Sequence, residues 1–242
     1  MERIGIKLAN IPIEVAVHHA STASFLRGYA CGGEPWEKLE ITQKHIEAER
    51  AAYAEQYPAE ACAVSVERLE LLALHRAVAE VLPRYDAAAC HGSAFSLNGK
   101  GVLLSGESGA GKSTHARMWR ERYGDEVLMI NDDKPILRIE NGEARLYGSP
   151  WMGKHALGAN ISAPLFALAS VRRAGENALR PLADDELWQT LSSCIYLPSG
   201  AAEMLNTLQL MDRVRSCGAR FFALECIIAH SAAEAAREAF GI

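Results

Sequence analysis

The alternation of hydrophobic and polar residues predicts two stretches of different organisation. In residues 1–85, RIGIKLANIPIEVAVHH alternates as one or two strands do, and KLEIT is typical of another strand. Two helices should follow, one beginning at Thr42 and ending before Pro58, the other beginning at Ser65 and ending at Pro83. We therefore expect an N-terminal α+β subdomain over residues 1–85.

Hairpins and helices alternate from residue 86 onward. Asn98-Gly99 and Asn141-Gly142 each join two apolar segments, which is the strongest short hairpin signal. A helix over STHARMWRERY should end at Gly124. Further strands are expected at YDAAACHG, EVLMINDD, PLFALASVRRA and ARFFALEC, and helices at DDELWQTLSSC, AEMLNTLQLMDRVRSC and SAAEAAREAF. This order predicts an α/β domain with mixed sheets over residues 86–242.

The composition disfavours several classes of protein. Of the 242 residues, 49% are hydrophobic and 23% are charged; the net charge of −5, without a basic stripe, disfavours nucleic-acid binding. The sequence shows neither a membrane-spanning run nor a signal-peptide pattern, so we expect a cytoplasmic protein with no membrane partner. Six cysteines without a CxxC pair predict buried, reduced thiols. His18-His19 is not expected to bind a metal, because adjacent strand residues face opposite sides of a sheet.

Residues 106–113, GESGAGKS, match the motif G-x-x-x-x-G-K-[ST] in full. Glycines let backbone amides surround phosphate oxygens, and the helix that follows directs its positive end toward the same anion. Lys112 supplies a mobile charge for the β- and γ-phosphates, and the Ser113 hydroxyl is placed to bind Mg²⁺. We predict nucleoside triphosphate binding through these residues: Gly106, Glu107, Ser108, Gly109, Ala110, Gly111, Lys112, Ser113 and Thr114.

Two acids and a histidine are predicted to lie near this motif. Asp132 and Asp133 end an apolar strand, and carboxylates at such an end face the ligand crevice of an open sheet. One could hold the metal and the other could accept the proton of an attacking hydroxyl, a polar turn being the alternative. His91 begins the hairpin strand beside the motif, so we expect it at the same mouth, with a purely structural role as the alternative.

These features together resemble a known family. His91-Gly92, the hairpin with Gly99 and Gly101, GVLLSGESGAGKST and the Asp-Asp pair are similar to the catalytic domain of HPr kinase/phosphorylase, which has a phosphoenolpyruvate-carboxykinase-like fold. The resemblance covers residues 86–155. It implies a kinase that uses ATP and Mg²⁺ to phosphorylate a hydroxyl group, with a protein or peptide serine as the expected acceptor, and it favours self-association.

The resemblance also implies roles for individual residues. Lys112 would bind the nucleotide, Ser113 and Asp133 would hold the metal, and Asp132 or Asp133 would be the base. His91 would assist at the γ-phosphate. The chain departs from the family at residues 145–148, RLYG, where those kinases have Glu-x-Arg-Gly. The missing acid argues against a second metal and against reverse phosphorolysis.

The departure leaves other groups to consider. Arg145 and Lys154 offer positive charges for phosphate oxygens, with solvated surface charges as the alternative, and Trp151 is expected to anchor its loop. Two other functions also fit the sequence. A nucleotide-binding regulatory protein would need the glycine motif but neither the acids nor His91, and a small-molecule kinase is the other alternative. Carboxykinase activity is disfavoured, because no second set of metal-binding histidines and lysines is found. Neither the acceptor nor the choice between ATP and GTP can be predicted.

Overall fold

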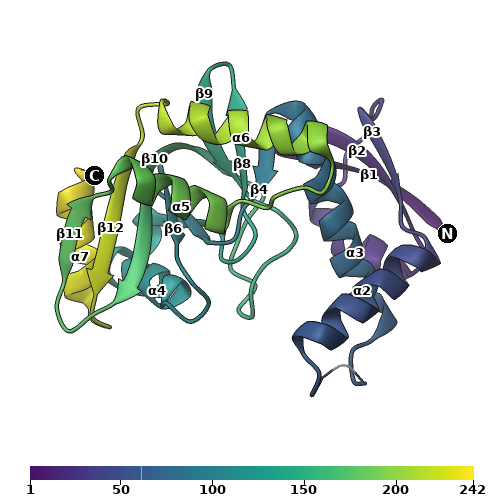
Figure 1. Ribbon diagram of the computed structural model, residues 1–242, viewed down its shortest axis with the longest axis horizontal. Helices are drawn as coiled ribbons and strands as arrows, with labels where there is room; N and C mark the ends of the chain where they lie inside the picture. The colour runs from purple at the N-terminus through teal and green to yellow at the C-terminus, as the bar shows by residue number, and fades with distance from the viewer. Residues whose placement is uncertain (61) are drawn as a thin grey trace. The chain divides into compact units, whose positions relative to one another are not determined.

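The computed structural model describes residues 1–60 and 62–242, which form two compact units, Met1–Val81 and Leu82–Ile242 (Figure 1). Within these ranges, no helix has the length and apolar character that crossing a membrane requires. The second unit combines mixed sheets with helices, so the mixed α/β class is confirmed. The functional division into residues 1–85 and 86–242 stays a prediction.

The first unit packs helices against a small sheet. Its elements are β1 (Glu2–Leu8), β2 (Ile11–Val17), α1 (Ala20–Phe25), β3 (Glu37–Glu40), α2 (Gln43–Gln56) and α3 (Val66–Val81). Strands β1 and β2 are antiparallel, and β3 runs parallel to β2. The predicted strands and both long helices are confirmed, and Ser65 Oγ accepts the N–H of Arg68 at 3.2 Å at the start of α3. Helix α1 was not predicted, because ASTASF carries no apolar helical period.

The described residues of the second unit form one nine-stranded sheet with helices on both faces. Its strands are β4 (Ala87–Ala89), β5 (Ser93–Leu97), β6 (Lys100–Ser105), β7 (Val127–Asn131), β8 (Ile136–Glu140), β9 (Glu143–Tyr147), β10 (Ser162–Arg173), β11 (Ala178–Pro181) and β12 (Arg220–Cys226). Its helices are α4 (Lys112–Tyr123), α5 (Asp184–Cys194), α6 (Ala201–Arg215) and α7 (His230–Phe240). Both predicted hairpins are confirmed, with positive φ at Asn98, Gly99, Asn141 and Gly142. The short edge strand β11 was not predicted.

Strand β10 joins the parts of this sheet. Its first residues pair antiparallel with β9, and the rest runs parallel to β6 on one side and β12 on the other. The strand order is β4-β8-β9-β10-β6-β5-β7, with β12 beside β10 and β11 beside β12. Helices α5 and α6 bury Leu191 and Leu210 on one face, whereas α4 and α7 bury Trp119 and Phe240 on the other (Figure 1). The sheet is therefore the middle of three layers.

The cysteines are free thiols in the described part of the chain. Cys90, Cys194 and Cys226 are buried, as predicted. Cys31 and Cys217 are only partly buried, and the expectation of burial is wrong for Cys62, which is exposed because it lies in turns between α2 and α3.

Candidate active site

The strand register brings three predicted site segments to one edge of the sheet. Ser93, at the start of β5, lies opposite Leu104 near the end of β6, and Ala94 lies opposite Asn131 at the end of β7. Strands β10 and β12 run parallel to β6 and end at this edge too. The residues that precede β5 and those that follow β6 and β7 therefore meet at the edge where open sheets bind ligands.

The glycine loop, residues 106–111, joins β6 to α4 at this edge. Its φ angles are 144° at Gly106, 78° at Gly109 and 107° at Gly111, a region that L side chains rarely adopt. A Cβ added at Gly106 would also meet the carbonyl oxygen of Val171 at 2.6 Å. The loop therefore needs glycine at these three positions, and Gly106 also allows the close approach of β10.

Lys112 is the first residue of α4, and only 8% of it is exposed. Its Nζ donates to the carbonyl oxygens of Gly106, at 2.8 Å, and Glu107, at 3.1 Å. Burial lowers the pKa of Lys112, while the nearby charge of Asp133 acts in the opposite direction. The ammonium group thus lies within the glycine loop and within electrostatic range of Asp133.

Asp133 forms a charged cluster with His91 and Lys134. Its Oδ1 lies 3.0 Å from His91 Nδ1 and 2.8 Å from Lys134 Nζ, and Lys134 Nζ is 3.1 Å from the same Nδ1. Burial raises the pKa of Asp133, but the hydrogen bond from His91 and the charge of Lys134 outweigh it and hold that pKa well below its usual range. Asp133 is therefore ionised. His91 Nδ1 can donate to Asp133 or accept from Lys134, but it cannot do both at once.

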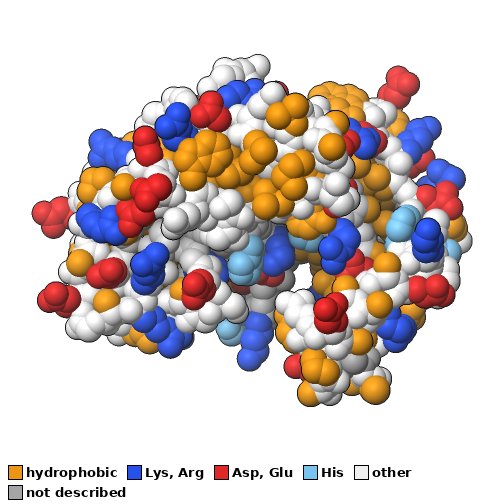
Figure 2. Space-filling model, in the orientation of Figure 1, with side chains coloured by type: hydrophobic (Ala, Val, Ile, Leu, Met, Phe, Trp, Pro, Cys, Tyr) orange, Lys and Arg blue, Asp and Glu red, His pale blue; other side chains and the backbone are white. Residues whose placement is uncertain are grey.

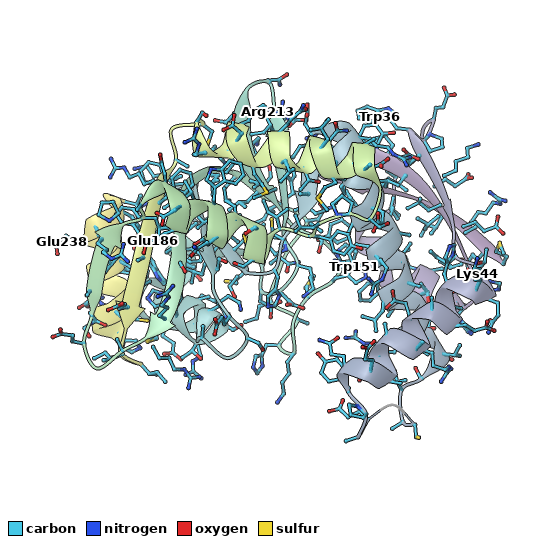
Figure 3. The ribbon with its side chains drawn as sticks, in the orientation of Figure 1. Trp36, Lys44, Trp151, Glu186, Arg213 and Glu238 are labelled. Carbon is cyan, nitrogen blue, oxygen red and sulfur yellow. The ribbon has the colours of Figure 1, made fainter. Side chains whose placement is uncertain are left out.

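Asn131 was not predicted as a site residue, yet it shapes the acidic turn. It is fully buried, and its Oδ1 accepts the backbone N–H of Asp133 at 2.8 Å and of Lys134 at 2.6 Å. Its Nδ2 donates to the carbonyl oxygens of Ser149 and Trp151. An asparagine before two acids is a signal for such a side-chain-to-backbone turn, and it could have been used. Trp151, labelled in Figure 3, is buried and so suits a loop anchor.

The carboxylate of Asp132 holds the loop that follows β9. Only 7% of it is exposed; its Oδ1 accepts the N–H of Gly153 at 2.7 Å, and its Oδ2 accepts that of Leu157 at 3.3 Å. Its own carbonyl oxygen accepts the Ser93 hydroxyl at 3.2 Å. Residues 153–157 therefore wrap around a carboxylate that comes directly from the end of β7.

A larger cavity of about 710 Å³ lies on one side of the glycine loop. Residues 106–110, the ends of β10 and β12, and α5 form its wall. Its polar lining includes Glu107, Arg172, Arg173, Arg180, Glu186, Gln189, Thr190, Ser193 and Glu225. Glu186, labelled in Figure 3, accepts hydrogen bonds from both Nη atoms of Arg180, each at 2.6 Å.

A smaller cavity of about 420 Å³ lies beside α4. It is lined by Ser113, Thr114, Ala116, Arg117, Arg120, Met129, Asp132, His155 and Leu157. Ser113 and Asp132 thus border the same space.

The site suits a metal that arrives with a phosphate ligand. Within the described residues, no three His, Cys, Asp or Glu side chains gather to hold a metal by themselves. Ser113 and an ionised Asp133 nevertheless offer the hard oxygen ligands that Mg²⁺ prefers, and Mg²⁺ usually takes few protein ligands alongside phosphate oxygens. These two residues are therefore the oxygen donors that could hold Mg²⁺ together with a nucleotide.

Two of the predicted cations lie apart from this group. Arg145 pairs with Glu143 at 2.5 Å and lies 3.4 Å from Ser162 Oγ, and it lines neither cavity. Lys154 is exposed in the loop after β9 and lines neither cavity. Arg172 and Arg173, which line the larger cavity, were missed because only the β10–β6 register brings them beside the glycine loop.

Comparisons with known proteins yield distant likenesses, and these are to solved structures. No family model matches the chain, and no curated protein does. Among solved structures, the chain is similar to the Hpr(Ser) kinase/phosphatase from Coxiella burnetii at 15% identity, over 53% of this chain and 88% of that chain, with a TM-score of 0.27. With so low a TM-score, the likeness decides neither the fold nor the activity.

Proposed function

We propose that this protein is a kinase that uses ATP and Mg²⁺ to phosphorylate a hydroxyl group. The observation that carries the proposal is the strand register, which brings the glycine loop, His91 and the two aspartates to one sheet edge. Lys112, the cation nearest the loop carbonyls, would turn to the β- and γ-phosphates once they displace its present contacts.

The proposed roles of the acids follow from their surroundings. Ser113 and the ionised Asp133 would hold Mg²⁺, which neutralises charge on the phosphate oxygens. Asp132 would be the base, because it lines the smaller cavity and each of its carboxylate oxygens keeps a lone pair beside the hydrogen bond that it accepts from Gly153 or Leu157. The acceptor oxygen forms a bond to the γ-phosphorus while the bond to the β,γ-bridging oxygen breaks. The electron pair of that bond leaves with ADP, and the hydroxyl proton passes to Asp132.

His91 and Lys134 would assist at the transferred group. Lys134 Nζ lies 3.1 Å from Nδ1 of the imidazole and adds a positive charge to that of Lys112. Positive groups here would stabilise charge on the equatorial phosphate oxygens. The proposed contact of Lys154 with a phosphate gains no support, because Lys154 lines neither cavity.

The larger cavity would take the nucleoside. It borders the loop backbone at residues 106–110, and its volume of about 710 Å³ is within the usual range for cofactor pockets. Three arginines and three glutamates line it, so its formal charge balances, as suits an uncharged base and ribose. Gln189 offers both a donor and an acceptor to a base edge.

A nucleotide-dependent regulatory protein is the second candidate. The observation that favours it is α6, where 55% of Leu205 and 44% of Leu208 are exposed. Figure 2 shows apolar side chains gathered over α5 and α6. Exposed apolar side chains of this kind suit a partner protein or a second copy of the chain.

The experiment that tests the proposal follows the γ-phosphate. Full-length protein is incubated with γ-labelled ATP, Mg²⁺ and candidate acceptors that include seryl peptides and small hydroxyl compounds. A kinase moves label to an acceptor, and Lys112→Ala abolishes the transfer. Label that remains in ATP, or appears only as free phosphate with every acceptor, would favour the regulatory protein.

A further inference from the structure

The smaller cavity differs in charge from the larger one. The larger cavity has equal numbers of arginines and glutamates, as described above. The smaller cavity is lined by two arginines, Arg117 and Arg120, against one acid, Asp132, and it adds the imidazole of His155. A site with surplus positive charge beside a carboxylate would attract an anionic ligand.

The arginines share a helix face with Ser113. Arg117 and Arg120 are four and seven residues after Ser113 in α4, a spacing that places all three on one side of a helix. Arg117 pairs with Glu121 at 3.5 Å on the exposed surface, where such pairs are weak. Arg120 is half-buried, and among the residues that the structure describes it interacts with the charge of Glu121 but makes no direct ion pair. Of the two arginines, Arg120 is therefore the more available to bind a ligand.

We infer that the smaller cavity is the acceptor site and that it takes a small hydroxyl compound bearing a carboxylate or phosphate, which Arg120 binds. This inference rests on the proposed kinase function. Asp132, the base, lies in the same cavity, so the reacting hydroxyl would face it while the acid group reaches along α4. Ser113 and Arg120 are separated by about 10 Å along the helix axis, which limits the acceptor to a compact molecule. Met129 and Leu157 provide the apolar contacts for its carbon skeleton.

The cavity volume agrees with this class of acceptor. About 420 Å³ is near the lower end of the range for small-molecule sites. A guanidinium binds either a carboxylate or a phosphate through two parallel hydrogen bonds. The group that Arg120 recognises is therefore an oxyanion, and the assay distinguishes a carboxylate from a phosphate.

The first experiment compares matched acceptors. Full-length protein receives γ-labelled ATP and Mg²⁺ with glycerate or glycerol, with glucose 6-phosphate or glucose, or with a seryl peptide. We expect kcat/KM at least tenfold higher for an anionic compound than for its neutral partner, and the pair that responds identifies carboxylate or phosphate. Transfer to neutral compounds as fast as to anionic ones, or to the peptide alone, overturns the inference and leaves the kinase function standing. Label that stays in ATP throughout counts against the function itself.

The second experiment does not require the natural acceptor. Malonate and inorganic phosphate are titrated calorimetrically into protein loaded with ADP and Mg²⁺, with malonamide as the neutral control. Arg120→Gln should weaken binding of the responding anion at least tenfold, and Arg120→Lys should weaken it less. Arg122→Gln is the matched control, since Arg122 lies on the same helix but pairs with Glu234. The inference fails if neither anion binds, or if Arg120→Gln raises KM for ATP instead, because Arg120 would then bind the nucleotide.

Discussion

Each unit contains a histidine paired with a carboxylate, and the two pairs have the same length but different surroundings. His19 Nδ1 lies 3.0 Å from Glu70, and His91 Nδ1 lies 3.0 Å from Asp133. Glu70 is fully buried and also accepts the N–H groups of His18 and His19 and the Thr22 hydroxyl. The Asp133 side chain is 31% exposed, and its carboxylate contacts the side chains of His91 and Lys134.

The difference shows which of the two pairs can interact with a ligand. The carboxylate of Glu70 is saturated by donors from its own unit, which fix the start of α1, so no ligand can approach it. Asp133 binds its partners through Oδ1 and lies near Lys112. Whether a histidine–carboxylate pair is structural or can act on a ligand therefore depends on how many acceptor positions of the carboxylate are still unoccupied.

The largest expected effect is the loss of phosphoryl transfer in Asp133→Asn. The amide cannot supply a negative charge to Mg²⁺ or to His91, so kcat should fall about a thousandfold. Stability should change by no more than about 1 kcal/mol, because the side chain is partly exposed and its ion pairs are screened. Transfer kinetics and urea unfolding measure the two quantities, and wild-type kcat in the variant would contradict the role of Asp133.

Glu70→Ala should produce the opposite pattern. It leaves the two backbone N–H groups, the Thr22 hydroxyl and the His19 ring without their acceptor, so we expect the first unit to lose about 3 kcal/mol of unfolding free energy. Glu70→Gln keeps an acceptor oxygen and should lose less. The rate of transfer per folded molecule should not change in either variant. Urea unfolding followed by circular dichroism gives the free energy, and a fall in kcat without a loss of stability would refute the structural role.

His115 sharpens the comparison, because it is a buried histidine without a carboxylate. Its Nδ1 accepts the Trp119 indole N–H at 3.1 Å, and burial lowers its pKa from 6.5 to about 4. Between these values the unfolded chain binds a proton that the folded chain does not, so stability falls as the pH falls. The loss by pH 4 should reach about 3 kcal/mol. Unfolding free energies at pH 7, 5.5 and 4 should show a shallower decline in His115→Gln; identical profiles would exclude the effect.

His19→Asn should have the smallest effect. It removes one partly exposed hydrogen bond to Glu70 while the other donors stay in place, which should cost about 1 kcal/mol. Transfer activity should be that of the wild type. Thermal melting and the labelled-ATP assay measure both; a loss of activity at full stability would show that the first unit contributes to catalysis.

Local signals in the sequence predicted much of the fold. Asn98-Gly99 and Asn141-Gly142 form the hairpins because both positions of each turn require positive φ. The strand-to-helix context of the glycine loop was predicted as well. Helix α1 and strand β11 were missed because both are short, and tertiary contacts stabilise them more than local propensity does.

The candidate site was predicted less completely. Lys112, Ser113, Asp132 and His91 could be named, but Lys134 could not, because only the contact with His91 distinguishes it from a surface lysine. Arg145 attracted attention as a cation, yet it pairs with Glu143 on its own hairpin. The sequence alone does not show which groups a charged side chain contacts, because the fold determines its neighbours.

The sequence by itself determined the glycine loop, because backbone conformations that only glycine adopts readily leave few alternatives at those positions. It also determined the hairpins and most of the helices, whose signals lie within a few residues of one another. Only the tertiary structure decided which side chains meet, since His91, Lys112 and Asp133 come together through the register of β5, β6 and β7. It likewise decided the difference between the cavities, because their charges come from strands and helices far apart in the chain.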